Sequence, residues 1–66
     1  MKICLNGENK ELAGGLTLEQ LLNDLQIPIG RVACEVNLKI IKRTLYGTTA
    51  LCDGDTVEII QAIGGG

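Results

Sequence analysis

The segment TLEQLLNDLQIP, residues 17–28, restricts the fold of this 66-residue chain more than any other. Thr17 and Gln20, three positions apart, form a capping-box pattern that predicts the start of a helix. Four leucines follow with helical spacing and form one stripe that we expect to face a core: Leu18, Leu21, Leu22 and Leu25. Pro28 prevents the helix from continuing, and about two and a half turns are not stable alone. The helix must therefore pack on a sheet.

The residues before this helix predict a β-hairpin. Ile3 and Leu5 alternate with polar positions in the period of a strand. Asn6-Gly7 is a strong turn pair, because both residues tolerate positive φ. A second strand is expected over residues 10–12, and Gly14-Gly15 then breaks it.

The residues after the helix predict three more strands. The segment RVACEVNLKIIKR reads as two strands joined tightly at Asn37-Leu38, and the segment TLYGTTALC has no clear period. Asp53 and Asp55 enclose Gly54, a pattern that is more typical of a turn than of a catalytic carboxylate pair. Two sets of alternating residues are expected on opposite faces of the first of these strands: Val32, Cys34 and Val36 on one, and Ala33, Glu35 and Asn37 on the other.

The last strand, TVEIIQAI, should turn Val57 and Ile59 inward and Glu58, Ile60 and Ala62 outward. The order of elements predicts an α+β fold in which one helix crosses a mixed sheet of about four to five strands. The crossover through the helix allows the first and last strands to be parallel neighbours.

Composition argues against several classes of function. The net charge is −2, basic and acidic residues are mixed, and Tyr46 is the only aromatic residue, so a nucleic-acid surface is not expected. No apolar stretch approaches the roughly 20 residues of a membrane span. The three cysteines are widely spaced, without a CxxC pair or any histidine. We therefore expect small hydrophobic thiols, no disulfide, no metal site, no catalytic triad and a reducing, cytoplasmic location.

The sequence finishes with three glycines, Gly64, Gly65 and Gly66, after the expected last strand. We expect one compact domain over residues 1–63 and a flexible tail over 64–66. An extended stem of three residues reaches about 10 Å, and without side chains it could enter a narrow channel in a partner enzyme. It would carry an ionised α-carboxylate. The alternative is a frayed end with no role.

The outward residues near this tail form a candidate docking surface. Ile60 and Ala62, with Glu58, flank the tail, and an exposed apolar pair beside a reactive group is typical of a contact surface. The alternative is that the irregular segment covers this second face of the sheet.

Three blocks of sequence resemble the thiamine-biosynthesis sulfur carrier proteins, which are small ubiquitin-like β-grasp proteins. The blocks are RVACEVN at residues 31–37, the turn and strand DGDTVEI at 53–59, and the final glycines. Pro28 also fits the family pattern, whereas Cys34 departs from it and adds a spare thiol.

The resemblance implies a carrier and co-substrate that is not itself an enzyme. A ubiquitin-activating-like enzyme would adenylate the Gly66 carboxylate with Mg-ATP, with Gly64 and Gly65 threading its active site. A persulfide drawn from cysteine, for instance by a cysteine desulfurase, would replace AMP, and reduction would leave a thiocarboxylate. Thiazole synthase would receive the sulfur. No cofactor would be bound permanently.

Three alternatives stay open. The small subunit of molybdopterin synthase shares the fold and the chemistry but is usually longer. A ubiquitin-like modifier would use Gly66 to form isopeptide bonds. A β-grasp interaction module would have no chemistry at its end.

Overall fold

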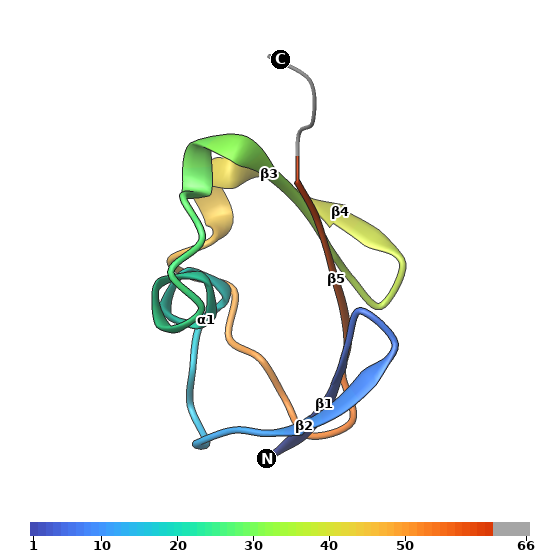
Figure 1. Ribbon diagram of the computed structural model, residues 1–66. Coiled ribbons are helices and arrows are strands. Elements are labelled where there is room, and N and C mark those ends of the chain that lie inside the picture. The colour runs from blue at the N-terminus through green and yellow to red at the C-terminus, as the bar shows by residue number, and fades with distance from the viewer. Residues whose placement is uncertain (62–66) are drawn as a thin grey trace.

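One helix crosses one face of a five-stranded sheet in the computed structural model, which describes residues 1–61 (Figure 1). The predicted α+β class, a ubiquitin-like β-grasp with a mixed sheet and one helix, is confirmed. The elements, in chain order, are β1 (Lys2–Leu5), β2 (Glu8–Glu11), α1 (Leu18–Asp24), the 3-10 turn η1 (Ile29–Arg31), β3 (Val32–Val36), β4 (Lys39–Ile41), the 3-10 turn η2 (Arg43–Leu45) and β5 (Thr56–Gln61).

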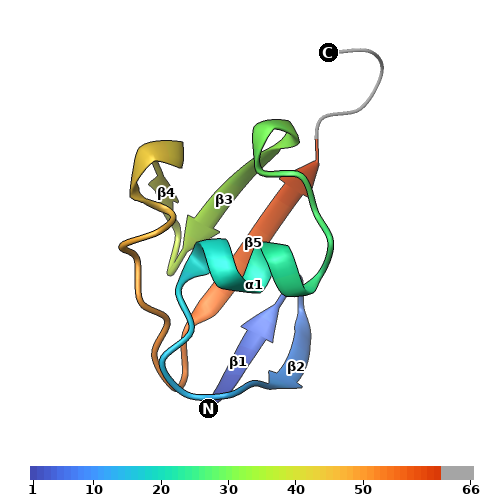
Figure 2. The same cartoon turned by 90° about the vertical axis from the view of Figure 1, so that its left-hand side faces the viewer.

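The strands lie in the order β2-β1-β5-β3-β4. β1 and β5 are parallel neighbours, as predicted, and the other pairs are antiparallel. β5 is therefore the central strand and is paired on both sides, with α1 crossing in front of it (Figure 2).

The first hairpin is tighter than the sequence predicts. Asn6 and Gly7 have φ of 50° and 83°, so they form a two-residue turn that matches the twist of the strands. Leu5 consequently pairs with Glu8. β2 therefore begins at Glu8, two residues before the start that the sequence predicts.

The helix begins as predicted but buries only part of its stripe. The Thr17 side chain accepts from the Gln20 amide at 3.2 Å, and the Gln20 side chain accepts from the Thr17 amide at 2.9 Å. Three leucines are fully buried: Leu18, Leu21 and Leu22. Leu25 is 38% exposed, so its prediction as a core residue is wrong. The helix ends at Asp24 and the chain reverses at Gln26, where φ is 59°; Ile27 then packs against the core.

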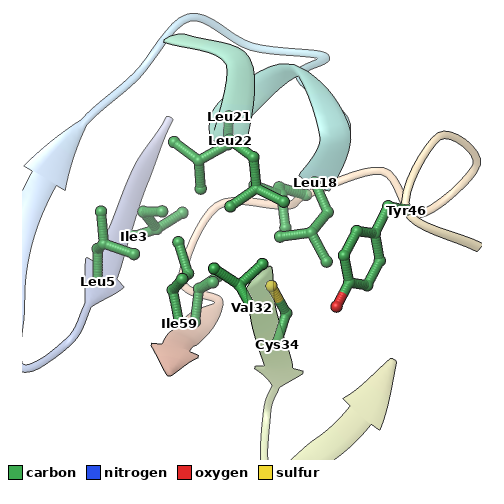
Figure 3. Packing of buried hydrophobic residues seen from close by; sticks show 11 residues of the cluster. Ile3, Leu5, Leu18, Leu21, Leu22, Val32, Cys34, Tyr46 and Ile59 are labelled. Atoms are coloured by element: carbon green, nitrogen blue, oxygen red, sulfur yellow. The ribbon is translucent and has the colours of Figure 1, made fainter. Parts of the chain in front are cut away.

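The segment TLYGTTALC, residues 44–52, which has no clear period in the sequence, completes the core. Tyr46 and Leu51 are 2% and 4% exposed and belong to the same buried cluster as the helix leucines. Figure 3 shows Tyr46 next to Leu18. Backbone hydrogen bonds attach this segment to the helix start: the Leu18 amide donates to the Thr49 carbonyl at 2.9 Å, and the Leu51 amide to the Leu16 carbonyl at 2.9 Å. Tyr46 and Leu51 therefore lie on the helix side of the sheet.

Cys34 is a buried core residue. Its side chain is fully buried on β3 and lies beside Tyr46 (Figure 3). Burial raises the pKa of the Cys34 thiol, and the neighbouring Tyr46 acts in the opposite direction with smaller effect. Burial also raises the pKa of the Tyr46 hydroxyl. The thiol that the sequence identifies as spare is thus part of the packing, while Cys4 is half-buried and Cys52 exposed.

Candidate functional site

The site begins where the central strand ends. β5 is held by β1 on one side and by β3 on the other, and its pairing with β3 continues to Gln61, which lies opposite Val32. Gln61 is also the last residue that the structure describes. The predicted tail glycines and the predicted contact residue Ala62 lie outside the described residues, as does the predicted domain boundary after residue 63.

The faces of β5 are those that its alternation predicts. Val57 and Ile59 are buried beneath the helix, whereas Glu58 is exposed and Ile60 is 54% exposed on the opposite face. Because the segment with Tyr46 packs on the helix side, it does not cover Ile60. The second face of the sheet is therefore open at Ile60.

Neighbouring strands extend this open face. Directly opposite residues of antiparallel strands share a face, and Ile60 lies opposite Ala33, Glu58 opposite Glu35, and Glu35 opposite Ile40. We call these five residues the open face: Ala33, Glu35, Ile40, Glu58 and Ile60. Ile40 is 76% exposed, and the two glutamates face each other, which is unfavourable for the free protein.

A hollow of about 280 Å³ lies at the end of β5. Its lining joins the open face to the start of β3 and to η2: Gly30, Arg31, Val32, Ala33, Arg43, Ile60 and Gln61. A larger hollow of about 470 Å³ lies on the β1–β2 hairpin and includes Lys2 and Gly54, which are hydrogen-bonded at the far end of the molecule. The smaller hollow is the one that is lined by Gln61, the last described residue.

Asp53 and Asp55 hold a turn. Asp53 Oδ1 accepts from the Lys2 amide at 2.7 Å, and Asp55 Oδ2 accepts from the Cys52 amide at 2.8 Å. Gly54 between them has φ of 89°, a conformation that favours glycine. The turn interpretation of DGD is confirmed, and both carboxylates serve the connection from the core segment to β5.

Residues 1–61 contain no group of three or more potential metal ligands, and none of their helices is long and apolar enough to cross a membrane. The sequence has no histidine to act as a base.

Sequence reasoning missed two groups of residues at this site. Ala33 and Ile40 join the open face only through strand pairing, which no short segment reveals. Arg31 and Arg43 line the hollow although they are far apart in the sequence. A hint was available, because four of the six basic residues lie between positions 31 and 43, with Glu35 as the only acidic residue there.

Comparisons with known proteins agree with this geometry. A family model described as the ThiS family matches residues 3–66. A protein named thiazole synthase from Paramagnetospirillum magneticum is 41% identical over 66 residues, which are all of this chain but only 20% of that protein. The protein named sulfur carrier protein ThiS from Escherichia coli is 30% identical, with 100% of both chains covered.

A solved structure gives the same result at the level of the fold. The crystal structure of a thiamine biosynthesis protein (ThiS) from Geobacter metallireducens matches with a TM-score of 0.87 and 30% identity, and all of both chains is covered. The chain therefore spans about a fifth of the thiazole synthase relative and the whole of the Escherichia coli and Geobacter metallireducens proteins. On the family match and on this full-length likeness, the chain belongs to the ThiS family.

Proposed function

We propose that this chain carries sulfur for thiamine biosynthesis as a thiocarboxylate on Gly66. The observation that supports the proposal is the position of β5 in this ThiS-family chain: the strand is paired on both sides, and the three final glycines begin three residues after Gln61 in the sequence. A rigid central strand fixes where the tail starts, and glycines give it the least bulk. The protein is then a co-substrate, and its partners supply the catalysis.

The chemistry takes place in three steps. The Gly66 carboxylate attacks the α-phosphorus of ATP on the adenylating enzyme, which gives an acyl-adenylate and releases pyrophosphate. A persulfide sulfur attacks the acyl carbon and expels AMP, which leaves an acyl disulfide. Reduction of the disulfide by two electrons, supplied by a thiol pair, releases the donor thiol and the thiocarboxylate. ATP and Mg²⁺ belong to the enzyme, and this chain keeps no permanent cofactor.

The same carrier must then meet thiazole synthase. The relative named thiazole synthase contains a region that matches all 66 residues of this chain within a much longer protein, which supports a direct contact between the two activities. Adenylating enzyme, persulfide donor and thiazole synthase would all need access to one chain end, so they would use it in turn.

The open face, which includes Glu58 and Ile60, is proposed as the docking surface for these partners, and Ala62 is proposed to extend it. Ile60 and Ala33 supply an apolar centre beside the tail, and Glu58 a polar edge. Ile60→Glu should weaken binding to the adenylating enzyme while the melting temperature stays nearly unchanged. Leu38→Glu is the matched control, because Leu38 is 84% exposed and lies outside the open face. Unfolding of the Ile60 variant would contradict the exposure of this side chain, and unchanged affinity would contradict the docking role.

The tail is tested by intact mass spectrometry after incubation with the adenylating enzyme, Mg-ATP and a persulfide source. The unreacted protein first establishes that Gly66 carries the free carboxylate. The wild type should then gain the mass of one oxygen-to-sulfur exchange, and deletion of Gly66 should abolish that gain without changing the melting temperature.

Gly65→Val should also block the exchange, because a β-branched side chain is stiff and bulky in a narrow channel. Gly14→Val is the matched control, since a Cβ at this loop glycine would meet no atom within 4 Å. A Gly66 deletion that still gains sulfur at the wild-type rate would refute the proposal. Lysine-linked conjugates instead of sulfur would indicate a protein modifier.

A further inference from the structure

Two arginines line one hollow beside Gln61, the last described residue of β5. Arg31 immediately precedes β3, whose first residue, Val32, pairs with Gln61. Arg43 opens η2 just after β4, and its Nη2 donates to the carbonyl of Gly30 at 3.5 Å. This bond joins η2 to η1, and both arginines line the 280 Å³ hollow that Ile60 also lines. We call Arg31, Arg43 and Ile60 the basic hollow.

No acidic side chain within residues 1–61 lies at ion-pair distance from either arginine. The single ion pair of the described residues joins the Met1 amine to Glu11 at 3.9 Å, on the strand at the other side of the sheet. Both arginines are exposed. The chain as a whole is acidic, with a net charge of −2, so the two arginines form a positively charged region on a protein of negative net charge.

We propose that the basic hollow binds carboxylate side chains on the adenylating enzyme, at the rim of the channel that admits the tail. The inference rests on the proposed function and names a contact of that same site. An apolar centre with a charged rim is the usual anatomy of a protein interface, and Ile60 with the two arginines has this arrangement. Guanidinium groups pair with carboxylates in a bidentate geometry that also fixes orientation.

The length of the tail favours a protein surface over the nucleotide as the occupant. Gly66 lies five residues beyond Gln61, so a threaded, extended tail would carry the reacting carboxylate about 17 Å away. The ATP that reacts there is out of reach of Arg31 and Arg43. What lies beside these arginines, when the tail is inserted, is the entrance of the channel.

The test compares two double variants in binding to the adenylating enzyme by calorimetry. Arg31→Glu with Arg43→Glu should weaken binding about tenfold or more at about 0.05 M salt, and less than about threefold at about 0.5 M salt. Lys2→Glu with Lys10→Glu changes the net charge equally on the β1–β2 hairpin and should have little effect. Exchange of the matching rim carboxylate for Arg on the enzyme should restore the affinity of the first variant.

The outcomes separate this inference from the proposed function. A wild type that the enzyme neither binds nor adenylates overturns both. If the wild type is adenylated but the arginine double variant binds as tightly as the wild type, the proposed role of the basic hollow is wrong and the proposed function stands. The same conclusion follows if the lysine double variant loses as much affinity as the arginine double variant. It also follows if the isolated carrier binds ATP in a way that depends on the arginines. If Arg43→Glu lowers the melting temperature through loss of its bond to Gly30, Arg31→Glu alone must still reduce affinity in a salt-dependent way.

Discussion

The turn between β3 and β4 contains two adjacent residues whose replacement by glycine should have opposite effects. Asn37 and Leu38 both have positive φ, 53° and 69°. Leu38 is 84% exposed, so burial of its side chain does little to offset the cost of its left-handed backbone conformation. The Asn37 side chain donates to Asp55 Oδ1 at 3.0 Å and accepts from the Thr56 amide at 3.0 Å. We expect Leu38→Gly to stabilise the protein and Asn37→Gly to destabilise it.

The magnitudes follow from the two environments. The left-handed conformation costs a side-chain-bearing residue about 1–2 kcal/mol, and glycine loses about 0.5–1 kcal/mol more backbone freedom on folding. Leu38→Gly should therefore raise the free energy of unfolding by about 0.5–1 kcal/mol. Asn37→Gly removes two hydrogen bonds worth about 0.5–1.5 kcal/mol each and relieves little strain, because asparagine tolerates this conformation. It should lower the free energy of unfolding by about 1–2 kcal/mol.

Urea denaturation followed by circular dichroism measures both changes. In a domain of this size about 1 kcal/mol shifts the melting temperature by about 4–8 °C, so the two variants should melt on opposite sides of the wild type. Leu38→Asn, which keeps a side chain suited to positive φ, should also be stabilising. A Leu38→Gly protein that melts below the wild type would refute the strain argument, and an Asn37→Gly protein that melts above it would refute the role of the hydrogen bonds.

Two further predictions concern the core. Leu22→Ala should lower the free energy of unfolding by about 2–5 kcal/mol, because removal of a fully buried side chain leaves a cavity. Leu25→Ala should lower it by about 1 kcal/mol or less, because Leu25 is partly exposed just after the helix ends. Equal losses for the two variants in urea titrations would contradict the observed end of the helix. Burial raises the pKa of the Cys34 thiol, so the folded state keeps a proton that the unfolded chain loses, and stability should fall as pH rises above about 8.5. Cys34→Ala should flatten this decline as pH rises above about 8.5, and an unchanged slope would contradict the raised pKa of Cys34. The raised pKa of Tyr46 leaves a further decline at higher pH.

Local sequence patterns determined the elements and their faces. The capping box of Thr17 with Gln20 fixes the helix start, because both hydrogen bonds form between residues three positions apart. Alternation along β5 determines that Val57 is buried and Ile60 exposed, since successive side chains of a strand point to opposite faces. These features depend on neighbours within a few residues, and the sequence contains all of that information.

Only the tertiary structure decided which residues meet across the chain. Leu25 continues the leucine stripe, but the helix ends one residue earlier and Ile27 takes the place against the core. Tyr46 belongs to a segment without hydrophobic periodicity, yet it is buried, because backbone hydrogen bonds to the start of the helix hold this segment on the helix side of the sheet. The bond from Arg43 to Gly30 joins two segments that are 13 residues apart. Contacts of this kind arise from strand order and loop paths, so local periodicity carries no record of them.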